Sequence, residues 1–202
     1  MFKIGITGGT GSGKTTALEV IEKLGGLALD CDEIYHQLLL QNDELKSELS
    51  RHFPGVLVDG EIDRKKLGKL VFSDPAALLK LNEITHKYVD EEVERRIMEW
   101  DKKGGTFTAI DAIALLESDI AKKCDVIVGI TAPEEVRISR IMRRDGIDIS
   151  KARQRIDAQK PESFFIENCD HMLHNKYETL EEFGISCEGL FKKLLKGETP
   201  NG

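Results

Sequence analysis

The chain has 202 residues, a length that suits one domain with insertions rather than two full domains. Hydrophobic residues make up 40% and charged residues 32%, which excludes a disordered, collagen-like or coiled-coil protein. The net charge of −7 and the aromatic content of 6% argue against a general nucleic-acid binder, so we expect no nucleic acid among its partners.

Neither a membrane segment nor a cysteine framework is predicted. No apolar run approaches the roughly 20 residues of a membrane helix, so we expect no membrane partner. The four cysteines contain no C-x-x-C pair, which favours a reduced, cytoplasmic protein. The oligomeric state is left open by the sequence, and a monomer is compatible with it.

Strands and helices alternate at the start of the chain. Lys3–Thr7 predicts a short buried strand, and Thr15–Leu24 has the apolar spacing of a helix. A second strand is predicted at Leu27–Asp30, and a helical pattern follows from Asp32. The order strand, helix, strand indicates a parallel sheet with right-handed crossovers, and therefore an α/β fold.

The alternation stops between Ile34 and Trp100, where helical periods predict an insertion with one short strand near Val56–Val58. Three later strands complete a mainly parallel five-stranded sheet: Thr106–Asp111, Asp125–Ile130 and His171–His174. Thr131–Glu134 has capping-box spacing, which predicts a helix with Thr131 as its cap. The tail, residues 196–202, is predicted to fray.

The segment Gly8-Gly-Thr-Gly-Ser-Gly-Lys-Thr15 matches G-x-x-x-x-G-K-[ST], directly after a strand and directly before a helix. Glycines let backbone N–H groups surround a triphosphate, Lys14 can neutralise β/γ oxygens, and Thr15 can hold Mg²⁺. We therefore expect ATP and Mg²⁺ as cofactors. The expected nucleotide-binding residues are Gly9, Gly11, Ser12, Gly13, Lys14, Thr15 and Thr16.

Carboxylates follow two of the predicted strands. Asp32 comes just after the second strand, where it could accept the proton of an attacking hydroxyl or cap the helix that begins there; the spacing leaves both open. Asp111 ends a core strand in the Walker-B manner and is expected to hold Mg²⁺ through water. Glu117 is either a site residue or an exposed helix residue.

Basic residues concentrate between residues 137 and 160 of an otherwise acidic chain. Arg137, Arg140 and Arg144 share one face of the predicted helix. A solvated helix face is one explanation. We favour a mobile lid over residues 143–162, with Asp145-Gly146 as its joint and arginines directed at phosphates.

Taken together, these residues resemble the dephospho-coenzyme A kinases. The likeness covers roughly residues 4 to 175 and includes the helical insertion as well as the phosphate-binding loop. The matching segments are Thr7–Thr16, Asp30-Cys-Asp32 (the family has Asp-Ala-Asp), Gly60–Arg64 with Leu67 and Val71-Phe72, Leu81–His86, Asp111–Glu117 and Asp170–Asn175.

The resemblance implies that ATP phosphorylates the ribose 3′-hydroxyl of dephospho-coenzyme A, giving coenzyme A and ADP in the last step of coenzyme A biosynthesis. It implies a single P-loop kinase domain over residues 1–202 with a three-layer core. The expected core spans residues 1–33, 104–142 and 163–195, the acceptor-binding insertion 34–103, and the lid 143–162.

The resemblance also implies roles for single residues. Asp32 is expected to be the catalytic base and to contact the acceptor, which Arg64 and His86 also bind. Arg140 is expected to face the phosphates, as a catalytic residue alongside Lys14. Asn175 is expected in the nucleotide site.

Two departures from the family pattern affect these expectations. Ile113 and Ala114 stand where the family has proline and leucine. Phe165 and Asn168 stand where it commonly has basic residues, so any phosphate contact made there must be absent or come from Lys160 or another residue.

Other P-loop proteins are the alternatives. Another nucleoside or nucleotide kinase shares the core and the arginine chemistry, but the insertion motifs argue against it. A regulatory GTPase would use D-x-x-G and N-K-x-D motifs. Asp101–Gly104 matches the first but lies before the third strand instead of at its end, and Asn175–Glu178 has glutamate where the second needs aspartate. A non-catalytic nucleotide-binding protein is the third alternative.

Overall fold

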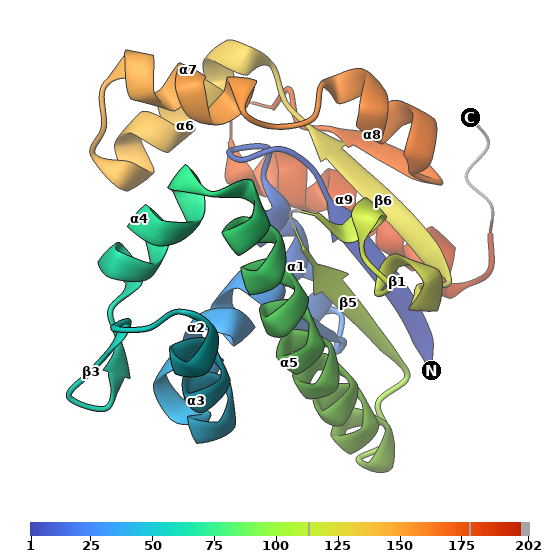
Figure 1. Ribbon diagram of the computed structural model, residues 1–202. Coiled ribbons are helices and arrows are strands. Elements are labelled where there is room, and N and C mark those ends of the chain that lie inside the picture. Colours follow the sequence, from blue (N-terminus) through green and yellow to red (C-terminus); the bar gives the residue numbers. More distant parts are fainter. Residues whose placement is uncertain (113, 178, 199–202) are drawn as a thin grey trace. The chain divides into compact units, whose positions relative to one another are not determined.

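The computed structural model describes residues 1–112, 114–177 and 179–198. It divides into two units, which Figure 1 traces in chain order. The core unit comprises Met1–Leu29 and Trp100–Gly202, and the insertion unit comprises Asp30–Glu99. The acceptor-binding insertion predicted at 34–103 stays a prediction.

A five-stranded sheet forms the core, in the order β2-β5-β1-β6-β7. Its strands are β1 (Phe2–Thr7), β2 (Leu27–Asp30), β5 (Phe107–Asp111), β6 (Val126–Thr131) and β7 (His171–His174). β1 pairs in parallel with β5 and β6, and β6 pairs in parallel with β7. The predicted five-stranded, mainly parallel sheet is confirmed, with all five strands close to their predicted positions.

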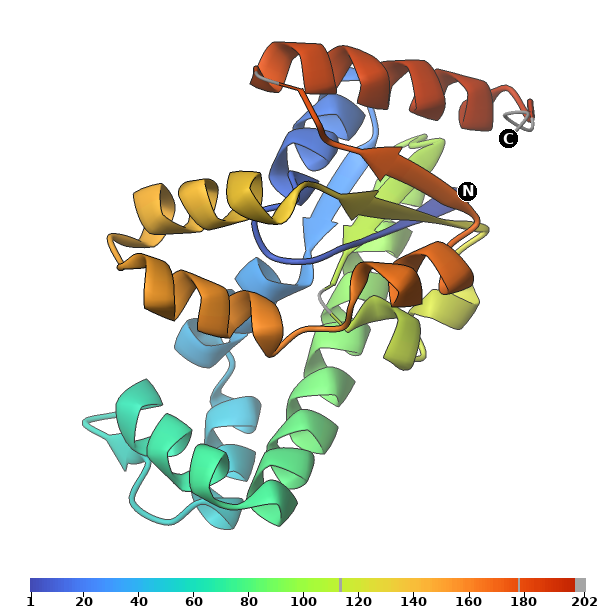
Figure 2. The ribbon, with the colours of Figure 1, turned by 90° about the horizontal axis from the view of Figure 1, so that it is seen from above.

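Helices cover both faces of this sheet (Figure 2). On one face, α1 (Lys14–Lys23) packs against α9 (Leu180–Leu195). On the other, α8 (Glu162–Asn168) contacts β6. Because its central strands are buried from both sides, β1 reads as the continuous apolar run Ile-Gly-Ile rather than as an alternating pattern.

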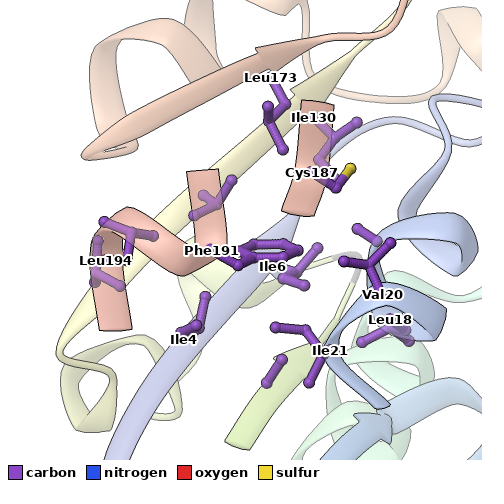
Figure 3. Packing of buried hydrophobic residues seen from close by; sticks show 14 of the residues in the cluster. Ile4, Ile6, Leu18, Val20, Ile21, Ile130, Leu173, Cys187, Phe191 and Leu194 are labelled. Atoms are coloured by element: carbon purple, nitrogen blue, oxygen red, sulfur yellow. The ribbon is translucent and has the colours of Figure 1, made fainter. Parts of the chain in front are cut away.

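The main core lies between the sheet and the pair α1 and α9 (Figure 3). Ile4 and Ile6 of β1, Ile130 of β6 and Phe191 of α9 are all without exposed surface. Burying a side chain of this size contributes roughly 1.5–3 kcal/mol. This packing holds β1 and α1, and therefore the loop between them, in a defined position.

The insertion unit has its own apolar cluster, which includes Leu45, Leu49, Val56 and Ile84. Its elements are α2 (Cys31–Gln41), α3 (Asp43–His52), β3 (Leu57–Val58), β4 (Glu61–Ile62), α4 (Arg64–Ser73) and most of α5 (Pro75–Lys102). The short strand expected near Val56–Val58 is present as β3. Its antiparallel partner β4 was not predicted, because two residues carry too little periodicity to indicate a strand.

The predicted helix cap at Thr131 is wrong. Thr131 is the last residue of β6, and its hydroxyl lies 2.9 Å from Nδ1 of His174 on β7. The helix α6 (Glu134–Asp145) starts after Pro133 without any side-chain cap. Sheet pairing with β7 therefore prevails over the local capping pattern.

The rest of the core unit consists of short helices and the tail. α7 (Ile149–Asp157) follows α6, and the 3₁₀ turns η1 (Leu115–Glu117) and η2 (Ala121–Lys123) follow β5. α9 ends at Leu195, but residues 199–202 of the predicted frayed tail lie outside the described residues, as does Ile113. Within the described ranges, every helix is too short or too polar to span a lipid bilayer.

Candidate active site

The loop between β1 and α1 has a backbone that only glycine adopts readily. Gly8, Gly11 and Gly13 have φ angles of 147°, 76° and 116°. A Cβ atom on Gly13 would lie 2.4 Å from Asn175 Nδ2, so space as well as conformation requires glycine there. Gly13 also caps α1 without a side-chain hydrogen bond, which leaves the first N–H groups of the helix for an anion.

Lys14 and Asp111 face each other beside this loop. Lys14 Nζ lies 3.9 Å from Asp111 Oδ1, and the two side chains are only 13% and 10% exposed. Parallel pairing aligns Asp111 with Ile6 of β1, which brings the tip of β5 to the loop. A desolvated cation and carboxylate at the start of α1 suit the binding of a triphosphate with a metal ion.

Oxygen donors for a metal ion are present at this point. Thr15 is exposed in the first turn of α1, and Asp111 is a carboxylate at the adjacent strand end. Hydroxyl and carboxylate oxygens are the donors that Mg²⁺ prefers, so these residues fit that ion. In the described part of the chain, no three His, Cys, Asp or Glu residues are grouped to hold a metal, so phosphate oxygens and water would have to complete the shell.

Arg137 and Gln159 hold the apex of the loop from outside. Arg137 Nε donates to the carbonyl oxygen of Thr10 at 2.9 Å, and its Nη2 donates to Gln159 Oε1 at 2.9 Å. Burial lowers the pKa of the Arg137 guanidinium. The sequence pattern predicts phosphate contacts for Arg137, but in the structure its donors bind the Thr10 carbonyl and Gln159.

Arg140 and Asn175 support the following part of the loop. Arg140 Nη1 donates to the Gly11 carbonyl at 3.1 Å, and its Nη2 donates to Asn175 Oδ1 at 3.3 Å. Asn175 Nδ2 donates to the Ser12 carbonyl at 2.8 Å, and Asn175 has no exposed surface. The contacts of Asn175 are therefore with the loop itself, which it ties to the end of β7.

Arg140 is half-buried without an ion-pair partner among the described residues. Burial is the main cause that lowers its pKa, and the neighbouring Arg143 acts in the same direction. A guanidinium remains charged at neutral pH even so. Arg140 therefore brings a positive charge to the loop, while its hydrogen bonds go to the loop carbonyls and to Asn175. That it faces the phosphates stays a prediction.

The segment predicted as a lid, residues 143–162, contains the end of α6, all of α7 and the start of α8. α7 packs on α6 through Ile138, Ile141 and Ala152. Arg144 and Arg155 both bind Asp145, and this pairing raises the pKa of Arg144. The one carboxylate of Asp145 thus offsets about half of the combined charge of these two arginines inside the segment.

Lys160 is already paired, so it does not replace the basic residues that the family commonly has at positions 165 and 168. Its Nζ lies 2.8 Å from Glu117 Oε1 on η1, and it also sits 5.0 Å from the Phe164 ring centroid. Phe165 is buried, while Asn168 Nδ2 donates back to the Phe164 carbonyl. Glu117 is half-exposed, and its observed partner is this lysine.

In the insertion unit, the helix cap is Asp30 and not Asp32. Asp30 Oδ1 accepts from the N–H groups of Asp32 and Glu33 at 2.9 and 3.1 Å. The capping interpretation of Asp32 is therefore wrong. Asp32 is an exposed carboxylate in the first turn of α2, so its sequence position is not explained by capping.

Arg64 pairs with a histidine that sequence analysis missed. Arg64 begins α4, which Asp63 caps, and its Nη2 lies 2.9 Å from His36 Nε2. Because a guanidinium only donates, His36 Nε2 is the acceptor in this contact. His36 lies four residues after Asp32 on α2, so the two side chains share one face of the helix. This spacing is the sequence signal from which His36 could have been predicted. His86 is exposed on α5.

Comparison with known proteins agrees with this geometry. The CoaE dephospho-CoA kinase family model matches residues 2–181. A dephospho-CoA kinase of Syntrophotalea carbinolica is 31% identical over 199 residues, 98% of this chain and 94% of that protein. One of Corynebacterium jeikeium is 33% identical over 195 residues, 96% of this chain and 100% of that protein.

Solved structures give the same result. A Thermus thermophilus protein superposes with a TM-score of 0.81 at 28% identity, covering 96% of this chain and 97% of its own. Dephospho-CoA kinase from Campylobacter jejuni gives 0.67 at 25% identity, covering 96% and 98%. Shikimate kinase from Acinetobacter baumannii, at 0.53 and 13% identity, shares the fold alone. By the family model and by these relatives, this chain belongs to the dephospho-CoA kinase family and is a P-loop phosphotransferase of coenzyme A biosynthesis.

Proposed function

We propose that the chain transfers the γ-phosphoryl group of ATP to the ribose 3′-hydroxyl of dephospho-coenzyme A, with the residue roles given below and with Mg²⁺ as its metal ion. The observation that carries the donor side is the uncapped start of α1 behind a left-handed glycine loop, beside the buried Lys14–Asp111 pair. Such a site binds a polyphosphate through N–H groups and one desolvated cation.

During transfer, the bond between the γ-phosphorus and the β,γ-bridging oxygen breaks, and a bond between the γ-phosphorus and the 3′-oxygen forms. Lys14 and Arg140 offset negative charge on the transferring group and on the departing β-phosphate. Asp32 accepts the proton of the 3′-hydroxyl. ADP leaves with the bridging oxygen, so atoms and charge balance without a further reactant.

Thr15 and Asp111 would hold Mg²⁺, Asp111 through water, and the ion would supply charge neutralisation at the β- and γ-phosphates. Their hard oxygen donors support this assignment.

The acceptor side belongs to the insertion unit. Arg64 and His86 bind dephospho-coenzyme A, and His36 holds the Arg64 guanidinium in place through its 2.9 Å contact. Asp32 lies in the first turn of α2, which Asp30 caps, so capping does not account for its carboxylate. The compartment that we propose is the cytoplasm, and the oligomeric state is a monomer. We propose neither nucleic acid nor a membrane as a partner.

The proposal is tested with purified protein, ATP and a panel of acceptors: dephospho-coenzyme A, adenosine, AMP and shikimate. ADP release is followed by a coupled assay, and the product is identified by mass spectrometry and by comparison with authentic coenzyme A. Turnover with dephospho-coenzyme A alone is expected, and its loss on adding EDTA and return with Mg²⁺ would support the metal. Comparable turnover with another acceptor would contradict the proposal.

Two arginines on α6 give a matched pair for the charge role. Arg140→Met is expected to lower kcat by roughly 10²–10³-fold, the size typical of losing one transition-state donor. Arg143→Met is the control, because Arg143 is exposed and makes no ion pair or hydrogen bond among described residues. Equal kcat values for the two variants would remove Arg140 from the catalytic group.

A further inference from the structure

One side-chain oxygen from outside the phosphate-binding loop fixes the peptide group at its apex. Gln159 lies in the connection between α7 and α8 and is half-buried. Its Oε1 accepts the backbone N–H of Thr10 at 2.9 Å. Thr10 is the central residue between Gly9 and Gly11, so the bond acts on the least constrained part of the loop.

Arg137 completes a hydrogen-bonded ring with Gln159 and Thr10. Its Nη2 donates at 2.9 Å to the same Gln159 oxygen that accepts from Thr10, and its Nε donates at 2.9 Å to the Thr10 carbonyl. Both the N–H and the C=O of Thr10 are therefore bound by side chains, one from the α7–α8 connection and one from α6. A Cβ on Gly9 would lie 2.4 Å from Arg137 Nη2, which shows how closely the guanidinium packs on the loop.

Binding of a polyphosphate depends on N–H groups that already point toward it, because reorienting peptides during binding would cost affinity. Four glycines make this loop flexible in isolation. We propose that Gln159 is a positioning residue for the nucleotide: by holding the Thr10 peptide together with Arg137, it orders the loop apex and thereby sets the affinity for ATP. This rests on the proposed function only in taking ATP as the occupant of the loop.

The competing explanation is that Gln159 only anchors the α7–α8 connection. It would affect thermal stability and both substrates alike, whereas a positioning role predicts a change specific to ATP and to the Thr10 amide. The two roles therefore predict different ratios of the KM for ATP to the KM for dephospho-coenzyme A. They also predict different hydrogen-exchange rates at the Thr10 amide.

The test compares Gln159→Leu with Gln154→Leu. Gln154 is an exposed residue of α7 whose side chain makes no hydrogen bond within the described ranges, so it controls for loss of a glutamine from this segment. For Gln159→Leu, we expect the KM and the Kd for ATP to rise about tenfold, with kcat and the KM for dephospho-coenzyme A within twofold of wild type. The Thr10 amide should exchange faster. Gln154→Leu should change none of these quantities.

Gln159→Glu keeps an acceptor oxygen for Thr10 and Arg137, so it should restore the slow exchange of the Thr10 amide. If Gln159→Leu does not fold, Gln159→Asn, whose oxygen is withdrawn by one methylene, gives the same comparison. An unchanged ATP affinity and unchanged Thr10 exchange in the folded variant would overturn the proposal, as would equal rises in both KM values. Calorimetric ATP binding keeps this test separate from the transfer assay: a wild-type protein that binds ATP without transferring phosphoryl would contradict only the proposed function.

Discussion

Substitutions at Asp30 and Asp32 separate capping of α2 from proton transfer, because the structure gives the cap to one carboxylate and leaves the other exposed. Asp32→Asn keeps the shape of the side chain and removes its charge and basicity. Asp30→Asn removes the same charge two residues away and keeps the cap, since asparagine caps about as well as aspartate. The pair is therefore matched in size, charge and location.

The expected magnitudes follow from these contacts. Asp32→Asn loses a negative charge in the first turn of a helix, which is worth roughly 0.3–1 kcal/mol of stability. For a chain of this length, that lowers Tm by at most about 4 °C. Loss of a general base should lower kcat by roughly 10²–10⁴-fold. Asp30→Asn should leave Tm and kcat near wild type, and Asp30→Ala, which loses both accepted hydrogen bonds, should cost about 1 kcal/mol.

Steady-state ADP release at saturating substrates gives kcat, and thermal unfolding followed by circular dichroism gives Tm. ATP affinity is measured separately by calorimetry and should be little altered in Asp32→Asn. A kcat for Asp32→Asn within tenfold of wild type would refute the reasoning and leave the reaction without an identified base. A similar loss of kcat in Asp30→Asn would show that general charge near α2, rather than basicity at Asp32, controls turnover.

Three further predictions concern charge. Lys14→Ala should lower kcat by well over tenfold, or ~1.4 kcal/mol; it should also lower Tm, because Asp111 loses its buried cation. Rates and unfolding curves check both, and a smaller kcat loss would exclude Lys14 from transition-state stabilisation. Thr15→Ala should raise the Mg²⁺ concentration for half-maximal rate more than the KM for ATP, which a metal titration measures; an unchanged titration would contradict the metal role. The hydrogen bond from Arg95, with one from Arg96, lowers the pKa of Glu92 from 4.5 to about 2, so this stabilisation is present above pH 4.5 and is lost as pH falls toward 2. The difference in urea-unfolding free energy between wild type and Glu92→Gln should therefore shrink over that window, and a constant difference would argue against the ion pair.

Much of the fold and of the donor side could be predicted from the sequence, because their determinants are contiguous. The loop from Gly8 to Thr15 needs glycine at residues of left-handed φ and a lysine at a fixed distance along the chain, and both are visible without coordinates. The strands that end at Thr7 and Asp111 are short apolar runs bounded by turn or polar residues. Buried parallel strands have this composition wherever they occur.

The tertiary structure decided which polar groups meet. Thr131 carries a capping pattern, yet its pairing with β7, forty-three residues along the chain, keeps it in the sheet. Asp30 and Asp32 are equivalent as caps by residue type, and only the backbone direction at the end of β2 selects Asp30. Gln159 and Arg137 meet Thr10 across separations of 149 and 127 residues. Local propensity acts over a few residues, whereas a hydrogen bond between distant segments exists only after the packing of β1, β6, α6 and α7 has brought its donor and acceptor together.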